Sequence, residues 1–137
     1  MTKAGPPPPR TVILDSEGLS KAVLRDTTLM NWTAAAVARD MSVVTSAATV
    51  VEVMHPKLNR SALDWTLSRI KVVPVDESIA RLSAQLLRDA KLHGHKHALD
   101  AMVCATALTS PGPRAILTSD PKDLITLSAG RATVVPI

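Results

Sequence analysis

Four acidic residues are placed where this sequence can build a site for a divalent cation: Asp15, Glu52, Asp100 and Asp120. Asp15 directly follows the apolar run TVIL, and Asp120 follows the similar run AILTS. Carboxylates that meet at one place repel each other unless a cation joins them, and sets of oxygen ligands select Mg²⁺ or Mn²⁺ rather than zinc. No single acid is specific for this chemistry, but their ordered placement favours a metal site.

Asp100 interrupts a long apolar stretch, in which positions 98–108 are apolar or small except for Asp100 and Thr106. This composition predicts a helix that is buried on most sides, with Asp100 on the same face as Val103 and Cys104. A charge on an apolar face is costly unless something compensates it. Either Asp100 lies in the first turn, where the helix dipole favours a carboxylate, or it is a metal ligand in an acidic pocket. The helix alone leaves both interpretations open.

Each of the other acids has an ordinary structural interpretation as well. Asp15 can cap the helix that follows it, and Glu52 can be a solvated residue on its own helix. Asp120 and Asp123 can be a turn residue and a first-turn helix carboxylate, respectively. The choice between these interpretations depends on whether the fold brings the acids together.

Short apolar runs predict strands, and the segments between them show helical patterns. The predicted strands are residues 11–14, 41–46, 71–75, 114–120 and 132–137, and the predicted helices are residues 20–26, 28–40, 47–55, 62–70, 77–93, 96–108 and 121–129. Asp76 is expected to cap the fifth helix and Gly94 to end it. Strands that alternate with helices indicate an α/β domain with a largely parallel sheet.

In open parallel sheets, sites form outside the carboxyl ends of the strands, where the strand order reverses. If the first and fourth strands are neighbours, Asp15 and Asp120 meet at that point. The helix of Asp100 leads into the fourth strand, and Glu52 follows the second strand. All four acids are therefore expected near one rim of the sheet.

The segment HGHKH at 93–97 also contains residues that can bind metal. Three alternating histidines beside a glycine make a poor tetrahedral set, so we do not favour zinc. We expect instead a basic loop beside the acidic rim, with Lys96 and His97 close to a phosphate. The sequence has no nucleophile–base pair, no phosphate-binding glycine loop and no dinucleotide fingerprint.

The composition fits one soluble domain with a small excess of positive charge. The chain has 137 residues, of which 46% are apolar, and a formal net charge of +4, which permits a polyanionic partner without requiring one. Its one cysteine, Cys104, fits a reducing cytoplasm and is expected to be a core residue. No apolar run has the length of a membrane span. Residues 1–10, with four consecutive prolines, are predicted to be a disordered tail.

Four segments resemble the PIN domain family, and within it the VapC-type toxin ribonucleases. They are VILDSEGL with Asp15, SAATVVEV with Glu52, HALDAMVCATAL with Asp100, and ILTSDPKDL with Asp120. The segment around Asp100 is the most specific of them. Many relatives carry Asn and then Asp in the last segment, whereas this chain has two acids there, Asp120 and Asp123. We favour Asp120 as the fourth acid because it directly ends the strand.

The resemblance implies a three-layer α/β/α sandwich with a central, mostly parallel five-stranded sheet over residues 11–137. It also implies an endoribonuclease dependent on Mg²⁺ or Mn²⁺, a homodimer and a cognate antitoxin. Asp15, Asp100 and Asp120 would hold one or two ions, and Glu52 would help to orient or deprotonate the attacking water.

Two further side chains, Ser16 and Thr118, are expected to supply supporting hydrogen bonds. Two other functions fit the same fold: a non-catalytic domain that binds a partner, and a phosphohydrolase acting on small phosphate esters. The four acids favour an enzyme over a partner-binding domain, because a binding domain has no need to concentrate uncompensated carboxylates at one rim.

Overall fold

The computed structural model of the protein describes residues 7–137. The predicted disordered tail, residues 1–10, therefore lies mostly outside the described residues. Arg10 is already attached to the domain, because its backbone N–H donates a 2.8 Å hydrogen bond to the carbonyl oxygen of Pro113. The described part begins its regular structure at the next residue.

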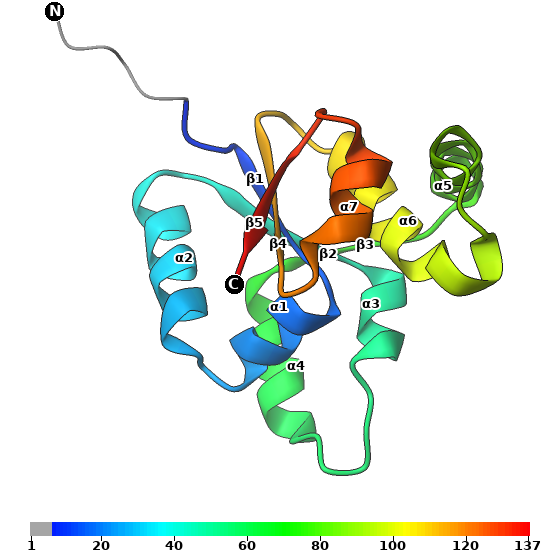
Figure 1. The fold of residues 1–137 in the computed structure, drawn as a ribbon. Coiled ribbons are helices and arrows are strands. Elements are labelled where there is room, and N and C mark those ends of the chain that lie inside the picture. Colours follow the sequence, from blue (N-terminus) through cyan, green and yellow to red (C-terminus); the bar gives the residue numbers. More distant parts are fainter. Residues whose placement is uncertain (1–6) are drawn as a thin grey trace, which may run out of the picture.

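A five-stranded, entirely parallel sheet forms the centre of the domain (Figure 1). Its strands are β1 (Thr11–Leu14), β2 (Ser42–Ser46), β3 (Lys71–Val73), β4 (Arg114–Thr118) and β5 (Thr133–Pro136). The spatial order is β3-β2-β1-β4-β5, so β1 and β4 are neighbours and the strand order reverses between them. The predicted parallel α/β sheet is confirmed, and its first and fourth strands are neighbours, which was the condition for Asp15 and Asp120 to meet.

Within residues 7–137, seven helices connect the strands: α1 (Ser16–Val23), α2 (Thr27–Ala38), α3 (Ala47–Glu52), α4 (Arg60–Arg69), α5 (Glu77–Ala90), α6 (Gly94–Leu108) and α7 (Pro121–Ser128). Apolar residues of α1, α2 and α4 form one core with one face of the sheet. Those of α5, α6 and α7 form a second core with the opposite face. The result is the three-layer α/β/α sandwich that the family resemblance implies.

Strand β1 is buried along its whole length because both faces of the sheet are covered. Successive side chains of a strand point to opposite faces. Ile13 accordingly belongs to the core beneath α5, α6 and α7, while Val12 and Leu14 belong to the core beneath α1, α2 and α4. A strand with this double burial reads as a continuous apolar run, as TVIL does.

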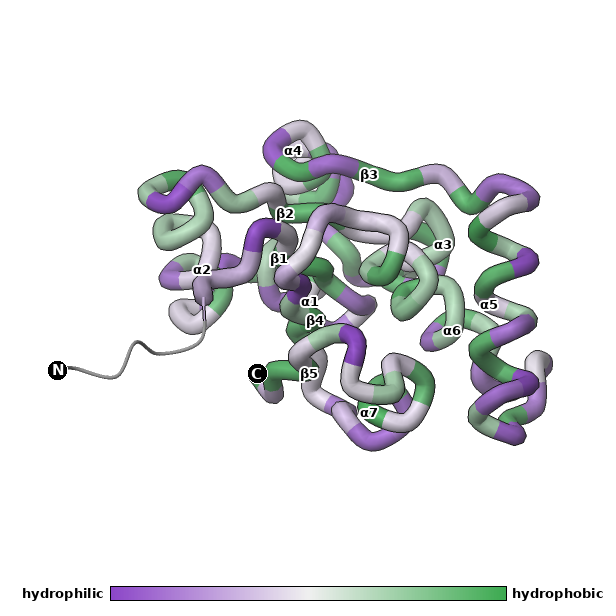
Figure 2. Tube along the Cα trace, turned by 90° about the horizontal axis from the view of Figure 1, so that it is seen from above, coloured by the Kyte–Doolittle hydropathy of each residue, from purple (hydrophilic) through white to green (hydrophobic). Residues whose placement is uncertain are grey.

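Two predictions about the segment before α6 were wrong. Helix α5 ends at Ala90 rather than near Gly94, because Lys91 takes a left-handed conformation (φ 58°) that ends it. Gly94 instead begins α6, so most of HGHKH is the first turn of a helix and not a basic loop. Figure 2 shows α5 at the edge of the molecule, with apolar and polar residues alternating along it. The earlier start of α6 matters for the site, since it moves Asp100 well past the first turn.

Candidate metal centre

Asp15 lies at the carboxyl end of β1 and at the beginning of α1, where two local features fix it. Its Oδ1 atom accepts a 2.9 Å hydrogen bond from the backbone N–H of Gly18, so the residue caps α1 as the structural interpretation proposed. A Cβ atom on Gly18 would lie only 3.1 Å from the carbonyl oxygen of Leu117. Glycine therefore lets α1 start tightly against the end of β4, with Asp15 only 7% exposed.

Burial raises the pKa of Asp15 above its usual value, because a carboxylate loses solvation when it leaves water. Hydrogen bonds from the side chain of Thr118 and from the backbone of Gly18 partly oppose this shift. The buried Thr118 hydroxyl also accepts a 3.0 Å hydrogen bond from the backbone N–H of Asp120, which leaves its proton available to Asp15. The ends of β1 and β4 are thus linked through this hydroxyl.

Asp100 lies on α6 and is surrounded by other acids. Its pKa is raised to about 6, mainly by burial and then by the negative charges of Asp123, Glu52 and Asp15. The charge of His97 acts in the opposite direction. The fold therefore places Asp123, Glu52 and Asp15 near enough to Asp100 for their negative charges to act on it.

Three side chains in this group are close enough to share one cation: His97, Asp100 and Asp123. One potential ligand atom from each lies within 4.8 Å of the other two. His97 and Asp100 stand one turn apart on α6, and Asp123 comes from the first turn of α7, which packs against α6. The Nδ1 atom of His97 lies 3.4 Å from Oδ2 of Asp123.

Asp120, which the sequence favours as the fourth acid, is not part of this group. Its side chain is exposed, although it occupies the expected position directly before α7. The acid that approaches Asp100 is Asp123, one helical turn later. The sequence also missed His97 as a member of the group, although its position three residues before Asp100 places both on one helical face.

The remaining predicted site residues differ in their exposure. Glu52 ends α3 and is exposed, and Ser16 is half-buried at the start of α1. Lys96 is exposed on α6. Cys104 is fully buried, and burial raises the pKa of its thiol to about 11, so it is an inert core residue as predicted.

The donors fit a divalent cation. The group offers several carboxylate oxygens and one imidazole nitrogen, and no Lys or Arg within residues 7–137 forms an ion pair with any of its acids. An apolar environment that collects carboxylates without a basic partner is costly unless a cation offsets the charge. His97, Asp100 and Asp123 are therefore the residues whose ligand atoms lie close enough together to hold such an ion, and Asp15 lies near enough for its charge to act on Asp100.

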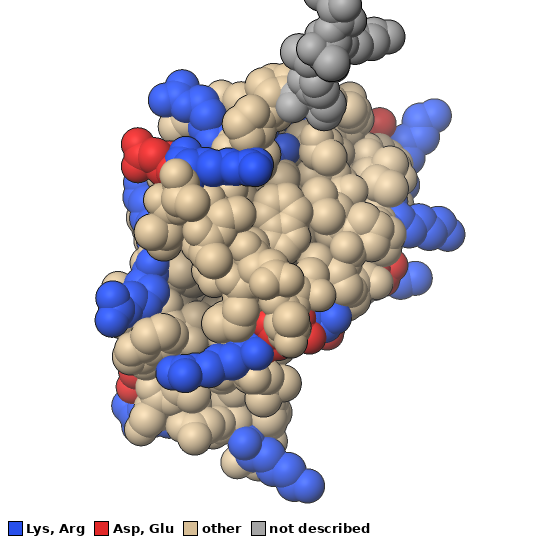
Figure 3. All heavy atoms as spheres, turned by 90° about the vertical axis from the view of Figure 1, so that its left-hand side faces the viewer, with Lys and Arg blue, Asp and Glu red and all other residues tan. Residues whose placement is uncertain are grey.

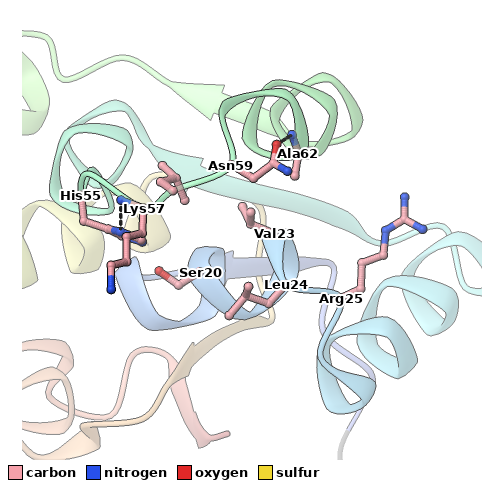
Figure 4. A pocket seen from close by; sticks show the side chains of 9 residues that line it. Ser20, Val23, Leu24, Arg25, His55, Lys57, Asn59 and Ala62 are labelled. Carbon is pink, nitrogen blue, oxygen red and sulfur yellow. Dashed lines mark hydrogen bonds between the residues drawn. The ribbon is translucent and has the colours of Figure 1, made fainter.

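A separate cavity of about 330 Å³ lies between the end of α1 and the connection from α3 to α4 (Figure 4). Its lining combines apolar side chains such as Leu24 and Val23 with the basic residues Arg25 and Lys57. Figure 3 shows Lys and Arg side chains around the rim of one face of the molecule, with few charges at its centre.

Among the described helices, none has the length and apolar character needed to cross a bilayer.

Three solved structures have the same fold over nearly their whole length. VapBC2 from Rickettsia felis, bound to a DNA fragment from its promoter, has a TM-score of 0.68 at 14% identity, covering 93% of this chain and 98% of that one. FitAcB from Neisseria gonorrhoeae has a TM-score of 0.63 at 22% identity, covering 90% of this chain and 95% of that one. FitAB bound to an IR36 DNA fragment has a TM-score of 0.60 at 23% identity, covering 91% of this chain and 94% of that one.

The sequence itself has no significant match among curated proteins. The sequence pattern of one family, however, matches residues 12–125, which include Asp15, Glu52, Asp100 and Asp123. The match covers most of the chain and contains every acid of the group described above. The chain belongs to the PIN domain family.

Proposed function

We propose that the protein is a metal-dependent endoribonuclease that acts as the toxin of a toxin–antitoxin pair. PIN domains are generally nucleases, and the observation that carries the proposal is the short distance between the ligand atoms of Asp100, Asp123 and His97, with Asp15 and Glu52 near enough for their charges to act on Asp100. The raised pKa of Asp100 supports it, because a site that holds a cation concentrates negative charge.

Each acid has a distinct task in this proposal. Gly18 and Thr118 hold Asp15 in one orientation, and Asp15 would assist Asp100 and Asp123 in holding the ion. A bound Mg²⁺ or Mn²⁺ ion would lower the pKa of a water molecule and stabilise the charge that develops on the phosphate. Glu52, exposed at the rim, accepts the proton of the attacking water. Ser16 and exposed basic residues such as Lys96 assist by contacting the RNA backbone.

The purified protein is expected to cleave single-stranded RNA in the presence of Mn²⁺ or Mg²⁺ and to stop when EDTA is added. Labelled RNA and gel electrophoresis measure the reaction, and labelled DNA of the same sequence serves as the comparison. An absence of cleavage with both ions would contradict the nuclease assignment and favour a non-catalytic domain that binds a partner.

A cognate antitoxin and a homodimeric assembly belong to the same proposal. The acids attract a guanidinium group, which can pair with two carboxylate oxygens and is always charged. The cavity beside α1 offers apolar area next to basic side chains. We propose that a terminal segment of the antitoxin places an Arg or Lys near Asp15 and Asp100, while an apolar helix of the antitoxin packs into this cavity.

Leu24→Asp is expected to weaken antitoxin binding by about tenfold or more, because a charge in the cavity removes apolar contact. Leu24 is 79% exposed, so the substitution does not disturb the core. Val37→Asp on α2 is the matched control, since Val37 is 87% exposed and lies outside the cavity. Calorimetry with the product of the neighbouring gene measures the affinity of each variant for the antitoxin. Equal affinities for the two variants would place the antitoxin elsewhere.

A further inference from the structure

We infer that His97 is a nitrogen ligand of the metal ion and makes the site select Mn²⁺ over Mg²⁺. This inference rests on the proposed metal site and adds a residue that the acids alone do not supply. It starts from the group of His97, Asp100 and Asp123, whose potential ligand atoms lie within 4.8 Å of each other.

The spacing fits two ligands of one ion better than a tight ion pair. A charged N–H···O hydrogen bond has a length of about 2.7–2.9 Å. The Nδ1 atom of His97 and Oδ2 of Asp123 are 3.4 Å apart. Two ligands that each lie about 2.1 Å from a shared ion are separated by roughly 3–3.5 Å when they are neighbours in its coordination shell. The observed distance falls in this range.

The position of His97 restricts what else it can do. Its side chain is only 13% exposed, in contrast to the other histidines of the segment, His93 and His95, which are exposed. Those two rings are tilted by 51° to each other, with centroids 6.0 Å apart, and are not part of the group with Asp100 and Asp123. The structure thus separates one histidine of HGHKH from its neighbours and turns it toward the acids.

A nitrogen ligand changes which ion the site prefers. Carboxylates alone suit Mg²⁺ and Mn²⁺ alike, whereas an imidazole raises the affinity for transition metals and adds little for Mg²⁺. An imidazole nitrogen that ligates a metal carries no hydrogen, so Nδ1 would be the ligand atom of His97. The mixed set of one nitrogen and several oxygens therefore favours Mn²⁺ over Mg²⁺.

Electron spin-echo spectroscopy of bound Mn²⁺ tests the inference directly, because a coordinated imidazole produces a ¹⁴N modulation. Substoichiometric Mn²⁺ is added to the full-length protein, to the variant His97→Gln and to the matched control His95→Gln. We expect the modulation in the wild type and in His95→Gln, and its loss in His97→Gln. Circular dichroism confirms that the variants are folded.

Binding constants give an independent readout. Titration is expected to show Mn²⁺ binding at least about tenfold tighter than Mg²⁺ in the wild type, and His97→Gln is expected to lose about tenfold in Mn²⁺ affinity and less than about threefold in Mg²⁺ affinity. Equal losses for both ions, or bound Mn²⁺ without ¹⁴N modulation in the wild type, would overturn the inference and leave the nuclease proposal intact. Conversely, a nitrogen-coordinated Mn²⁺ without RNA cleavage would support this inference while the nuclease proposal fails.

Discussion

Replacing Asp100 by Asn is expected to lower the rate of RNA cleavage by about 10³-fold or more while the protein stays folded. An amide has nearly the same shape as a carboxylate but carries no negative charge. Asp100 interacts with Asp123, Glu52 and Asp15, so its removal takes charge from the middle of the group. Loss of a charged ligand weakens both the hold on the ion and the stabilisation of the reacting phosphate.

Cleavage rates at saturating Mn²⁺ measure this loss. Asp76→Asn is the matched control, because Asp76 caps α5, is not among the acids whose charges act on Asp100, and Asn also serves as a cap. The control is expected to cleave RNA at the wild-type rate. Full activity of Asp100→Asn would show that the acidic group is not the site of reaction.

The same assay compares the two candidates for the fourth acid. The position at the end of the strand favours Asp120, whereas the geometry of the group favours Asp123. Asp123→Asn is expected to cause a loss similar to that of Asp100→Asn, because Asp123 approaches both Asp100 and His97. Asp120→Asn is expected to change the rate less than about tenfold, since its side chain is exposed. A larger loss in Asp120→Asn than in Asp123→Asn would instead support Asp120 as the fourth acid, as the sequence favours.

In EDTA at neutral pH, Asp100→Asn is expected to be more stable than the wild type. The pKa of Asp100 is about 6 in the folded protein, against an ordinary value of 3.8. Between these pH values the folded protein holds a proton that the unfolded chain has released, so the free energy of unfolding falls as the pH rises through this window and stays low above it. The free energy of unfolding of the Asp100→Asn variant does not fall in this way, because Asn carries no charge at any of these pH values.

The expected gain is about 1 kcal/mol near pH 7.5. The full pKa difference corresponds to roughly 3 kcal/mol, and solvent screening of the half-buried side chain reduces it. For a domain of this size, about 1 kcal/mol raises the Tm by roughly 3–4 °C. Thermal melts of both proteins at pH 7.5 and pH 4 measure the difference, which should nearly vanish at pH 4. A wild type that is the more stable protein in EDTA at pH 7.5 would show that the acids do not repel one another.

Local sequence determined the layers of the fold and the position of its first acid. TVIL forms a strand that is buried on both faces because its residues are β-branched or apolar throughout, and the chain after it favours a helix. Asp15 therefore had to lie at a strand end and cap a helix, wherever the rest of the chain lay. The alternation of such runs was enough to predict a parallel sheet.

The membership of the site depended on contacts that no local pattern contains. Asp100 had two interpretations until the early start of α6 at Gly94 removed it from the first turn. Asp123 and His97 meet because α7 packs against α6, and that packing sets which helical faces point at each other. Spacing along one helix identifies the residues that share a face, but the tertiary structure alone decides which other helix that face meets.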